Sequence, residues 1–250
     1  MKPNILRCGG LFVLLLILAA CTAAPQETPT APSANLPTIH VDITPAAQPA
    51  TAALDACMEV LTGFDLEVRE RYASQSDGDL LIRLGNPEGS PQPEAGFLAQ
   101  IATEDIRVVL HPDNLISSLT RPELFSLFSG KVTDWNQLGG KAAPVYVWVP
   151  LAADETRQAF EAEIMESLPV VSDARLAPDP AAMIEAVSAD PNTIGYLPAA
   201  WEIGDLQSTL LGIRMPVLVQ ADASPTGPAA DLVACMQGAI GQLALLSIYP

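Results

Sequence analysis

The sequence predicts an α/β fold, because segments with the patterns of strands and helices alternate along residues 38–250. Ile39–Thr44 alternates apolar and polar residues as a half-buried strand does, and a helical segment over about Thr51–Leu61 follows it. Leu80–Leu84 is a short, mostly apolar run of the kind that a buried sheet accepts. The length of this region suits one two-lobed unit or two small domains.

The same reasoning places the other elements in chain order. Further strands are predicted over Phe64–Tyr72, Ile106–Leu110, Pro144–Pro150, within Val170–Leu176, and over Thr193–Tyr196 and Arg214–Val219. Further helices are predicted over Pro122–Phe128, Asp154–Leu168, Pro180–Ala189 and Ala229–Leu246. The segment Gly85–Gly96 is too rich in Pro and Gly to be regular, so it is predicted to be a loop.

The most specific local pattern is LTRPELFSLFSGKVTDWNQLGG, residues Leu119–Gly140. Thr120 and Glu123 have the spacing of a capping box, and Pro122 stands in the first turn, where a missing N–H costs nothing. Apolar residues then recur at helical spacing before Ser129 and Gly130 stop the helix. A second turn is expected to carry Trp135 and Leu138 inward. Any one of these residues could equally belong to an ordinary core element.

The first residues have the pattern of a bacterial lipoprotein signal. Lys2 and Arg7 form a positive region, Leu11–Leu18 an apolar region, and a small-residue cleavage site ends in Cys21. We therefore expect a signal peptide over residues 1–20, lipidation of Cys21, and a disordered linker rich in Pro, Ala and Thr over residues 21–37. An ordinary secretory signal or an uncleaved anchor is the alternative. Lipidation would hold the protein to the cell membrane from the extracytoplasmic side.

Charge and composition exclude several functions. The chain has 12 Lys and Arg against 29 Asp and Glu, a net charge of −17, which argues against nucleic acid and anionic lipid surfaces as partners. Backbone N–H groups can still bind a small anion, whatever the net charge. Only His40 and His111 could serve a metal cluster or a catalytic triad, and they stand apart in the sequence. We therefore expect no catalytic residues, no metal and no cofactor.

The segment Leu119–Gly140 resembles the corresponding segment of the type II periplasmic binding proteins, particularly the phosphate ABC-transporter substrate-binding proteins. Ile106–Asn114, Asp154–Phe160 and Asn192–Pro198 also resemble that family, in its order and spacing. The resemblance implies two lobes, each a mixed sheet flanked by helices, joined by a two-strand hinge. It assigns residues 38–113 and 195–250 to lobe one and residues 114–194 to lobe two, with hinges near Pro112-Asp113 and Gly195-Tyr196.

The resemblance also implies a solute site in the cleft between the lobes. The family's Ser-Gly-Thr-Arg run, which grips an oxyanion, corresponds here to Asp154, Glu155, Thr156 and Arg157. At about 4 Å each added carboxylate would repel an anion by roughly 1 to 4 kcal/mol, so a phosphate site of the family type is not expected. The other cleft candidates are Thr44, Asp79, Arg83 and Tyr196.

Two cysteines remain outside the signal and the lipid site. Cys57 and Cys235 stand on helices that the resemblance places in lobe one, so they could form a disulfide in an oxidising compartment or remain two buried thiols. The function implied is that of a monomeric, lipid-anchored protein that hands a small molecule or ion to the permease of an ABC transporter. The alternative is a degenerate binding-protein fold that acts as a ligand-free sensing or protein-interaction module.

Overall fold

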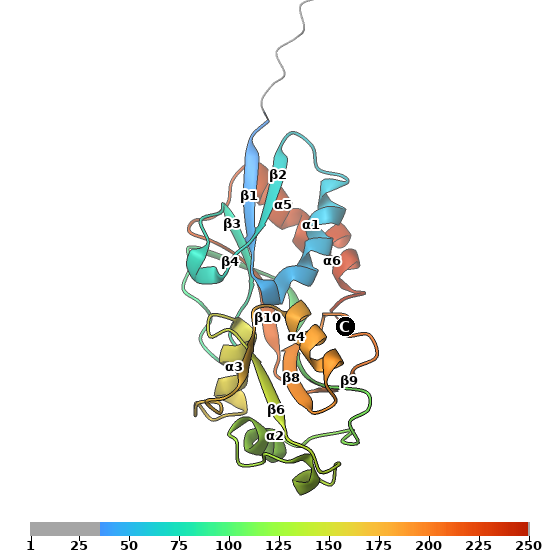
Figure 1. Cartoon of the computed structure of the whole chain (residues 1–250). Coiled ribbons are helices and arrows are strands. Elements are labelled where there is room, and N and C mark those ends of the chain that lie inside the picture. Colours follow the sequence, from blue (N-terminus) through green and yellow to red (C-terminus); the bar gives the residue numbers. More distant parts are fainter. Residues whose placement is uncertain (1–35, 250) are drawn as a thin grey trace, which may run out of the picture. The chain divides into compact units, whose positions relative to one another are not determined.

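The computed structural model of the chain describes residues 36–249 (Figure 1). These residues form two five-stranded sheets, with strand orders β2-β1-β3-β10-β4 and β7-β6-β8-β5-β9. Both sheets are mixed and flanked by helices, which confirms the predicted fold class. The predicted signal peptide, Cys21 and almost all of the predicted linker lie outside the described residues.

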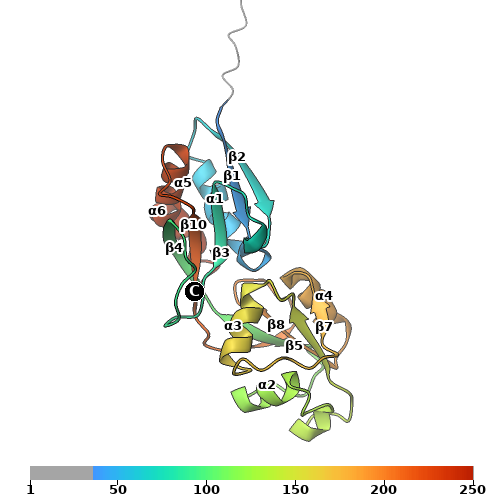
Figure 2. The ribbon, with the colours of Figure 1, turned by 90° about the vertical axis from the view of Figure 1, so that its left-hand side faces the viewer.

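The first lobe is built on the sheet that contains the N-terminal strand. Its strands are β1 (Thr38–Ile43), β2 (Asp65–Glu70), β3 (Leu80–Leu84), β4 (Phe97–Glu104) and β10 (Met215–Ala221). Strand β1 runs parallel to β2 and β3, whereas β10 runs antiparallel to β3 and β4. Three helices pack together on one side of this sheet, α1 (Thr51–Met58), α5 (Pro228–Gln237) and α6 (Ala239–Leu245) (Figures 1 and 2). A disulfide joins Cys57 of α1 to Cys235 of α5, which confirms that prediction.

The second lobe is built on β5 (Ile106–Leu110), β6 (Tyr146–Pro150), β7 (Arg175–Ala177), β8 (Thr193–Pro198) and β9 (Gln207–Leu210). Its helices are α2 (Arg121–Phe128), α3 (Glu155–Glu163) and α4 (Pro180–Ala189). The buried side chains Met183 and Val187 of α4 share a core cluster with Val109 of β5, whereas Val108 belongs to the cluster of α2 and α3. Because neighbouring strand residues point to opposite faces, helices cover both faces of this sheet.

The capping box and the apolar residues of segment 119–140 form the helix and the turn that the sequence predicts. The backbone N–H of Thr120 donates to the Glu123 carboxylate at 2.8 Å, and the reciprocal capping box opens α2. Leu124, Leu127 and Phe128 are buried in the core. The second turn is the short helix η3 (Trp135–Leu138), which ends at Gly139 with a φ of 88°. Two other short helices are η1 (Pro45–Ala50) and η2 (Ala73–Gln75).

The lobe boundaries differ from the prediction. Residues 106–110, 195–198 and 207–210 were assigned to lobe one, but β5, β8 and β9 belong to the second sheet. The chain passes between the sheets at Asp105 and at residues 211–214, so the predicted hinges near Pro112-Asp113 and Gly195-Tyr196 are misplaced. The boundaries were misplaced because strand β4 was not predicted. Strand β4 takes the place in the first sheet that the assignment to lobe one gave to Ile106–Leu110.

Three predicted helices were too long. Helix α1 ends at Met58 rather than at about Leu61. Helix α3 ends at Glu163 rather than Leu168, and Glu166 and Ser167, a little further on, adopt positive φ angles that no α-helix contains. The predicted C-terminal helix is divided into α5 and α6 at Gly238, whose backbone is extended. Among residues 36–249, no helix has the length and apolar character needed to cross a membrane.

Candidate functional site

The first half of the candidate site stands at the carboxyl ends of two neighbouring parallel strands. Thr44 follows β1, and Arg83 lies near the end of β3. The backbone N–H of Thr44 donates to the carbonyl of Ile82 at 2.9 Å, which fixes the two strand ends side by side. Thr44 also opens the short helix η1, whose first residues are buried. Strand ends of this kind are where α/β proteins place ligands.

The second half is the start of α3 in the other lobe. Asp154 is the N-cap of this helix, and its Oδ1 accepts hydrogen bonds from the backbone N–H groups of Thr156 at 2.8 Å and Arg157 at 3.4 Å. A carboxylate here is stabilised by the positive end of the helix dipole. Asp154 therefore satisfies the helix's own donors and has a structural role in this turn.

Glu155 brings the two halves together. Its Oε1 lies 3.5 Å from Nε of Arg83, although that Nε donates its hydrogen bond to the carbonyl of Leu84 at 3.1 Å. Only 4% of the Glu155 side chain is exposed, against 15% of the Arg83 side chain. The pair is thus a nearly buried interlobe ion pair without a hydrogen bond.

Several polar atoms around this pair lack a protein partner. Both carboxylate oxygens of Glu155 and the hydroxyls of Thr44 and Thr156 are buried without a hydrogen bond from the described residues. We refer to Thr44, Arg83, Asp154, Glu155 and Thr156 as the cleft cluster. Buried polar groups in proteins are nearly always paired, so four unpaired oxygens in one cluster need an explanation.

Burial in the cleft cluster raises the pKa of both carboxyl groups. Burial raises the pKa of Glu155 to about 7, with Arg83 acting in the opposite direction and Asp154 raising it further. Burial also raises the pKa of Asp154, against the hydrogen bonds from Thr156 and Arg157. Glu155 therefore changes charge close to neutral pH.

The side chains of Asp79 and Arg157, which were predicted to lie in the cleft, are bonded outside this cluster. Asp79 precedes the first residue of β3, at the opposite end of that strand from Arg83, and accepts the backbone N–H of His40 at 2.8 Å. Arg157 is tied within the second lobe, where its Nε donates to Glu161 at 2.8 Å and its Nη1 to the carbonyl of Pro150 at 3.0 Å.

Tyr196 lies in an aromatic core of the second lobe. Its ring stacks on Phe160 with centroids 3.9 Å apart and meets Phe128 edge to face at 5.4 Å. The side chain is fully buried, and burial raises the pKa of its hydroxyl well above the ordinary value. The hydroxyl has no hydrogen-bond partner among the described residues. Tyr196 therefore packs against α3 through Phe160, a buried residue of that helix.

Sequence reasoning missed two interlobe features. The hydroxyl of Tyr72 donates to the carbonyl of Pro178 at 2.6 Å, and nothing in the sequence pairs these two residues. At the chain crossing, Oε1 of Glu104 accepts the N–H groups of Asp105 at 2.8 Å and Ala200 at 3.2 Å. The Asp105 carboxylate in turn accepts the N–H of Ile213 at 2.9 Å. This hydrogen bond joins the two segments of the chain that pass between the sheets.

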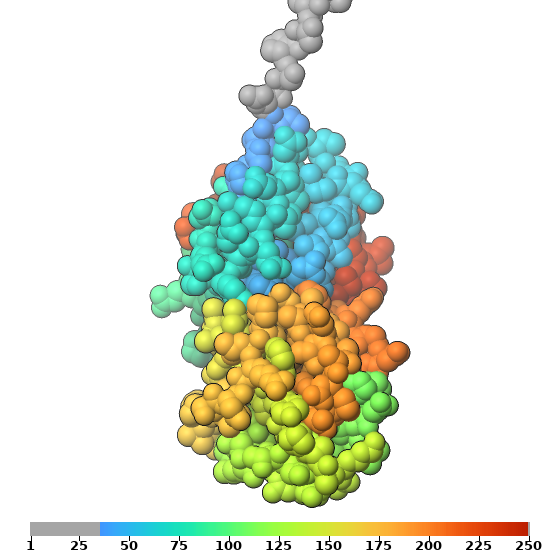
Figure 3. All heavy atoms as spheres, viewed as in Figure 1, coloured from blue at the N-terminus to red at the C-terminus, as the bar shows by residue number. Residues whose placement is uncertain are grey.

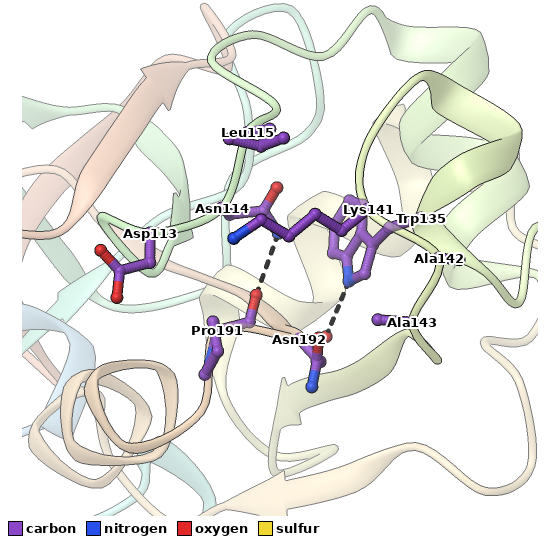
Figure 4. Close-up of a pocket in the computed structure, with 9 residues that line it drawn as sticks. All are labelled: Asp113, Asn114, Leu115, Trp135, Lys141, Ala142, Ala143, Pro191 and Asn192. Atoms are coloured by element: carbon purple, nitrogen blue, oxygen red, sulfur yellow. Dashed lines mark hydrogen bonds between the residues drawn. The ribbon is translucent and has the colours of Figure 1, made fainter.

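The surface of the described chain also contains pockets outside the cleft cluster. One of about 220 Å³ lies within the second lobe beside Asp113, Lys141 and Trp135 (Figure 4). Two of its polar groups are paired within the protein, because Trp135 Nε1 donates to the carbonyl of Asn192 and the Asn114 amide to that of Pro191. On the face shown in Figure 3 the spheres of the two lobes meet without an open gap. Residues 36–249 contain no group of three or more His, Cys, Asp and Glu side chains arranged to hold a metal ion.

Comparison with known proteins gives the same fold. Residues 97–241 match the family model described as a PBP superfamily domain. A protein from Clostridium perfringens, assigned to the phosphate ABC transporter substrate-binding proteins and carrying bound phosphate, has a similar structure, with a TM-score of 0.73 and 15% identity over 85% of this chain and 98% of that one.

Two further structures are similar. An ABC-type phosphate transport receptor from Vibrio cholerae gives a TM-score of 0.63 and 14% identity over 84% of this chain and 100% of that one. A reduced form of OxyR from N. meningitidis gives a TM-score of 0.59 and 12% identity over 84% of this chain and 97% of that one. At these identities the likeness concerns the fold alone.

Proposed function

Because the chain belongs to the family described as the PBP superfamily domain, we propose that it is an extracytoplasmic, lipid-anchored solute-binding protein that delivers a small molecule or ion to the permease of an ABC-type importer. Its fold is that of phosphate-binding proteins, and its anion site is altered. The proposed site is the cleft cluster, to which the two lobes contribute facing groups.

The observation that carries this proposal is the set of unpaired oxygens in the cleft cluster. The Thr44 hydroxyl comes from one lobe, and the Thr156 hydroxyl and both Glu155 oxygens come from the other. Leaving such a group buried without a partner costs about 1 to 3 kcal/mol. A solute that donates hydrogen bonds would satisfy these oxygens and recover that free energy. This is why we place the solute here and not in the pocket of Figure 4.

The same groups limit the kind of solute. The cleft cluster contains two carboxyl groups against one guanidinium, so its possible negative charges outnumber its positive charge. A free oxyanion would meet Asp154 and Glu155 at short range, where each repels it by roughly 1 to 4 kcal/mol when charged. A cationic, neutral or metal-bearing solute avoids this repulsion. We propose a solute of that kind.

The proposed location rests on two cysteine observations. The disulfide between Cys57 and Cys235 fits an oxidising compartment outside the cytoplasm. Cys21 stands at the end of the lipoprotein-type signal, outside the described residues. Mass spectrometry of membrane fractions should find acyl groups on Cys21, and Cys21→Ser should move the protein out of those fractions. An unmodified Cys21 in the membrane-bound protein would count against lipidation.

Solute binding is tested by thermal denaturation of the purified protein with amino acids, polyamines, divalent metals, phosphate, sulfate and molybdate. A solute at about a hundred times its Kd stabilises the fold by about 2.7 kcal/mol, which raises the Tm of a chain this size by roughly 5 to 10 °C. We expect such a rise with a cationic or neutral solute. Thr44→Val should weaken binding by about 1 kcal/mol, whereas the matched change Thr209→Val, on edge strand β9, should not.

The other outcomes would redirect the proposal. A rise in Tm with phosphate would mean that Asp154 and Glu155 do not exclude oxyanions, and would return the protein to phosphate uptake. A chain that responds to none of these solutes would fit the alternative, a ligand-free sensing or protein-interaction module. An equal loss of affinity in Thr44→Val and Thr209→Val would place the site elsewhere.

A further inference from the structure

The carboxylate of Glu155 is surrounded by groups that suit an anion. Arg83 of the first lobe places its Nε 3.5 Å from Oε1. The Thr44 hydroxyl of the same lobe is buried in the same cluster, and Glu155 itself is the first residue of α3. A guanidinium, a hydroxyl and a helix N-terminus are the components from which proteins build anion sites.

Capping α3 does not account for the presence of Glu155. The helix already has its cap in Asp154, whose Oδ1 accepts the N–H groups of Thr156 and Arg157. The Glu155 side chain is 96% buried, although neither of its oxygens receives a hydrogen bond from the described residues. A glutamate at the start of a helix is normally exposed, where it gains the dipole's attraction without losing hydration. The burial of Glu155 therefore follows from its interlobe position beside Arg83.

We propose that Glu155 is an internal ligand: its carboxylate occupies an anion cradle formed by Thr44, Arg83 and the first turn of α3, and so excludes free oxyanions while linking the two lobes. This rests on the proposed function only in placing the binding site at the cleft cluster. Glu155 is then the residue that determines specificity against small anions. A solute that donates hydrogen bonds remains compatible with it, because both carboxylate oxygens are still without a donor.

The proposal predicts that the cradle can be emptied and refilled. Glu155→Ala removes a methylene and a carboxylate, which together have the size and charge of acetate. Acetate should therefore raise the Tm of the full-length Glu155→Ala protein. At acetate concentrations above Kd, the rise should grow with the logarithm of the acetate concentration. Acetamide, which is neutral and of similar shape, should not. Wild type and Glu155→Gln, in which the side chain still fills the cradle, should not respond to acetate.

Two further variants identify the cradle. Arg83→Gln in the Glu155→Ala background should weaken acetate binding at least about tenfold, because the guanidinium is the cradle's only full positive charge. Glu161→Ala is the matched control on the same helix, since Glu161 pairs with Arg157 outside the cradle. It should leave the protein unresponsive to acetate. Chloride at equal ionic strength controls for general salt effects.

Each result decides the proposal. If Glu155→Ala folds and acetate does not raise its Tm, or acetate and acetamide act equally, Glu155 is not an internal ligand. If Glu155→Ala is unfolded alone, Glu155→Ser is tested beside it. Folding of either variant on addition of acetate would support the cradle, and failure of both to fold in acetate would overturn it. The wild-type solute panel is independent of these variants, so this inference can fail while the proposed function holds.

Discussion

Glu104 provides the sharpest test of the electrostatics at the chain crossing. It is the last residue of β4, it is 2% exposed, and its carboxylate receives the N–H groups of Asp105 and Ala200. Replacement by Gln removes the titrating group and keeps the shape. The single carbonyl oxygen of Gln can still accept both N–H groups, because Oε1 of Glu104 accepts both in the native protein.

The expected effect follows from the pKa of Glu104. Burial raises it from the ordinary 4.5 to about 7, although the N–H groups of Asp105 and Ala200 and the charge of Arg107 act to lower it. The folded state then binds more protons than the unfolded state between these values, so stability is greatest below pH 4.5 and is lost as the pH rises through about 7. At about 1.36 kcal/mol for each pK unit, this loss amounts to about 3 kcal/mol.

Urea unfolding at about pH 5 and about pH 8 measures this loss. Glu155 titrates over the same range for the same reason, so the wild-type protein should lose the contributions of both groups. Glu104→Gln should lose about 2 to 3 kcal/mol less than wild type between these pH values, because a pH of about 5 already lies above the ordinary pKa of 4.5. Glu59→Gln, an exposed change at the end of α1, should leave the wild-type loss unaltered. Equal pH dependence in wild type and Glu104→Gln would refute the burial argument.

The remaining predictions concern two links between distant residues. Replacing Cys57 and Cys235 by Ser should lower the free energy of unfolding by about 2 to 5 kcal/mol, because the disulfide closes a loop over a separation of 178 residues. Urea unfolding measures this, and an unchanged midpoint would mean that the bond adds no stability. Tyr72→Phe should cost about 0.5 to 1.5 kcal/mol through the lost interlobe hydrogen bond to Pro178. In the same assay, no loss in Tyr72→Phe would show that water replaces that bond.

Elements defined by neighbouring residues were predictable from the sequence. The capping box of Thr120 and Glu123 and the apolar stripe behind it need no information from elsewhere in the chain, and α2 begins within one residue of its predicted start. Strand β4 was missed because Phe97–Glu104 lacks a clear alternation of apolar and polar residues. Its strand conformation depends on pairing with β10, which comes much later in the sequence.

The candidate site shows the same division between local and distant information. The sequence places Asp154 at the start of a predicted helix, and Asp154 is its N-cap, a role that is set within one turn of the chain. Glu155, its neighbour, stands at the same predicted helix start. What separates the two is Arg83, which belongs to the other sheet and lies beside Glu155 only after both lobes have formed. The sequence could therefore name the residues of the cleft cluster, but the different environments of its two carboxyl groups follow from interlobe packing.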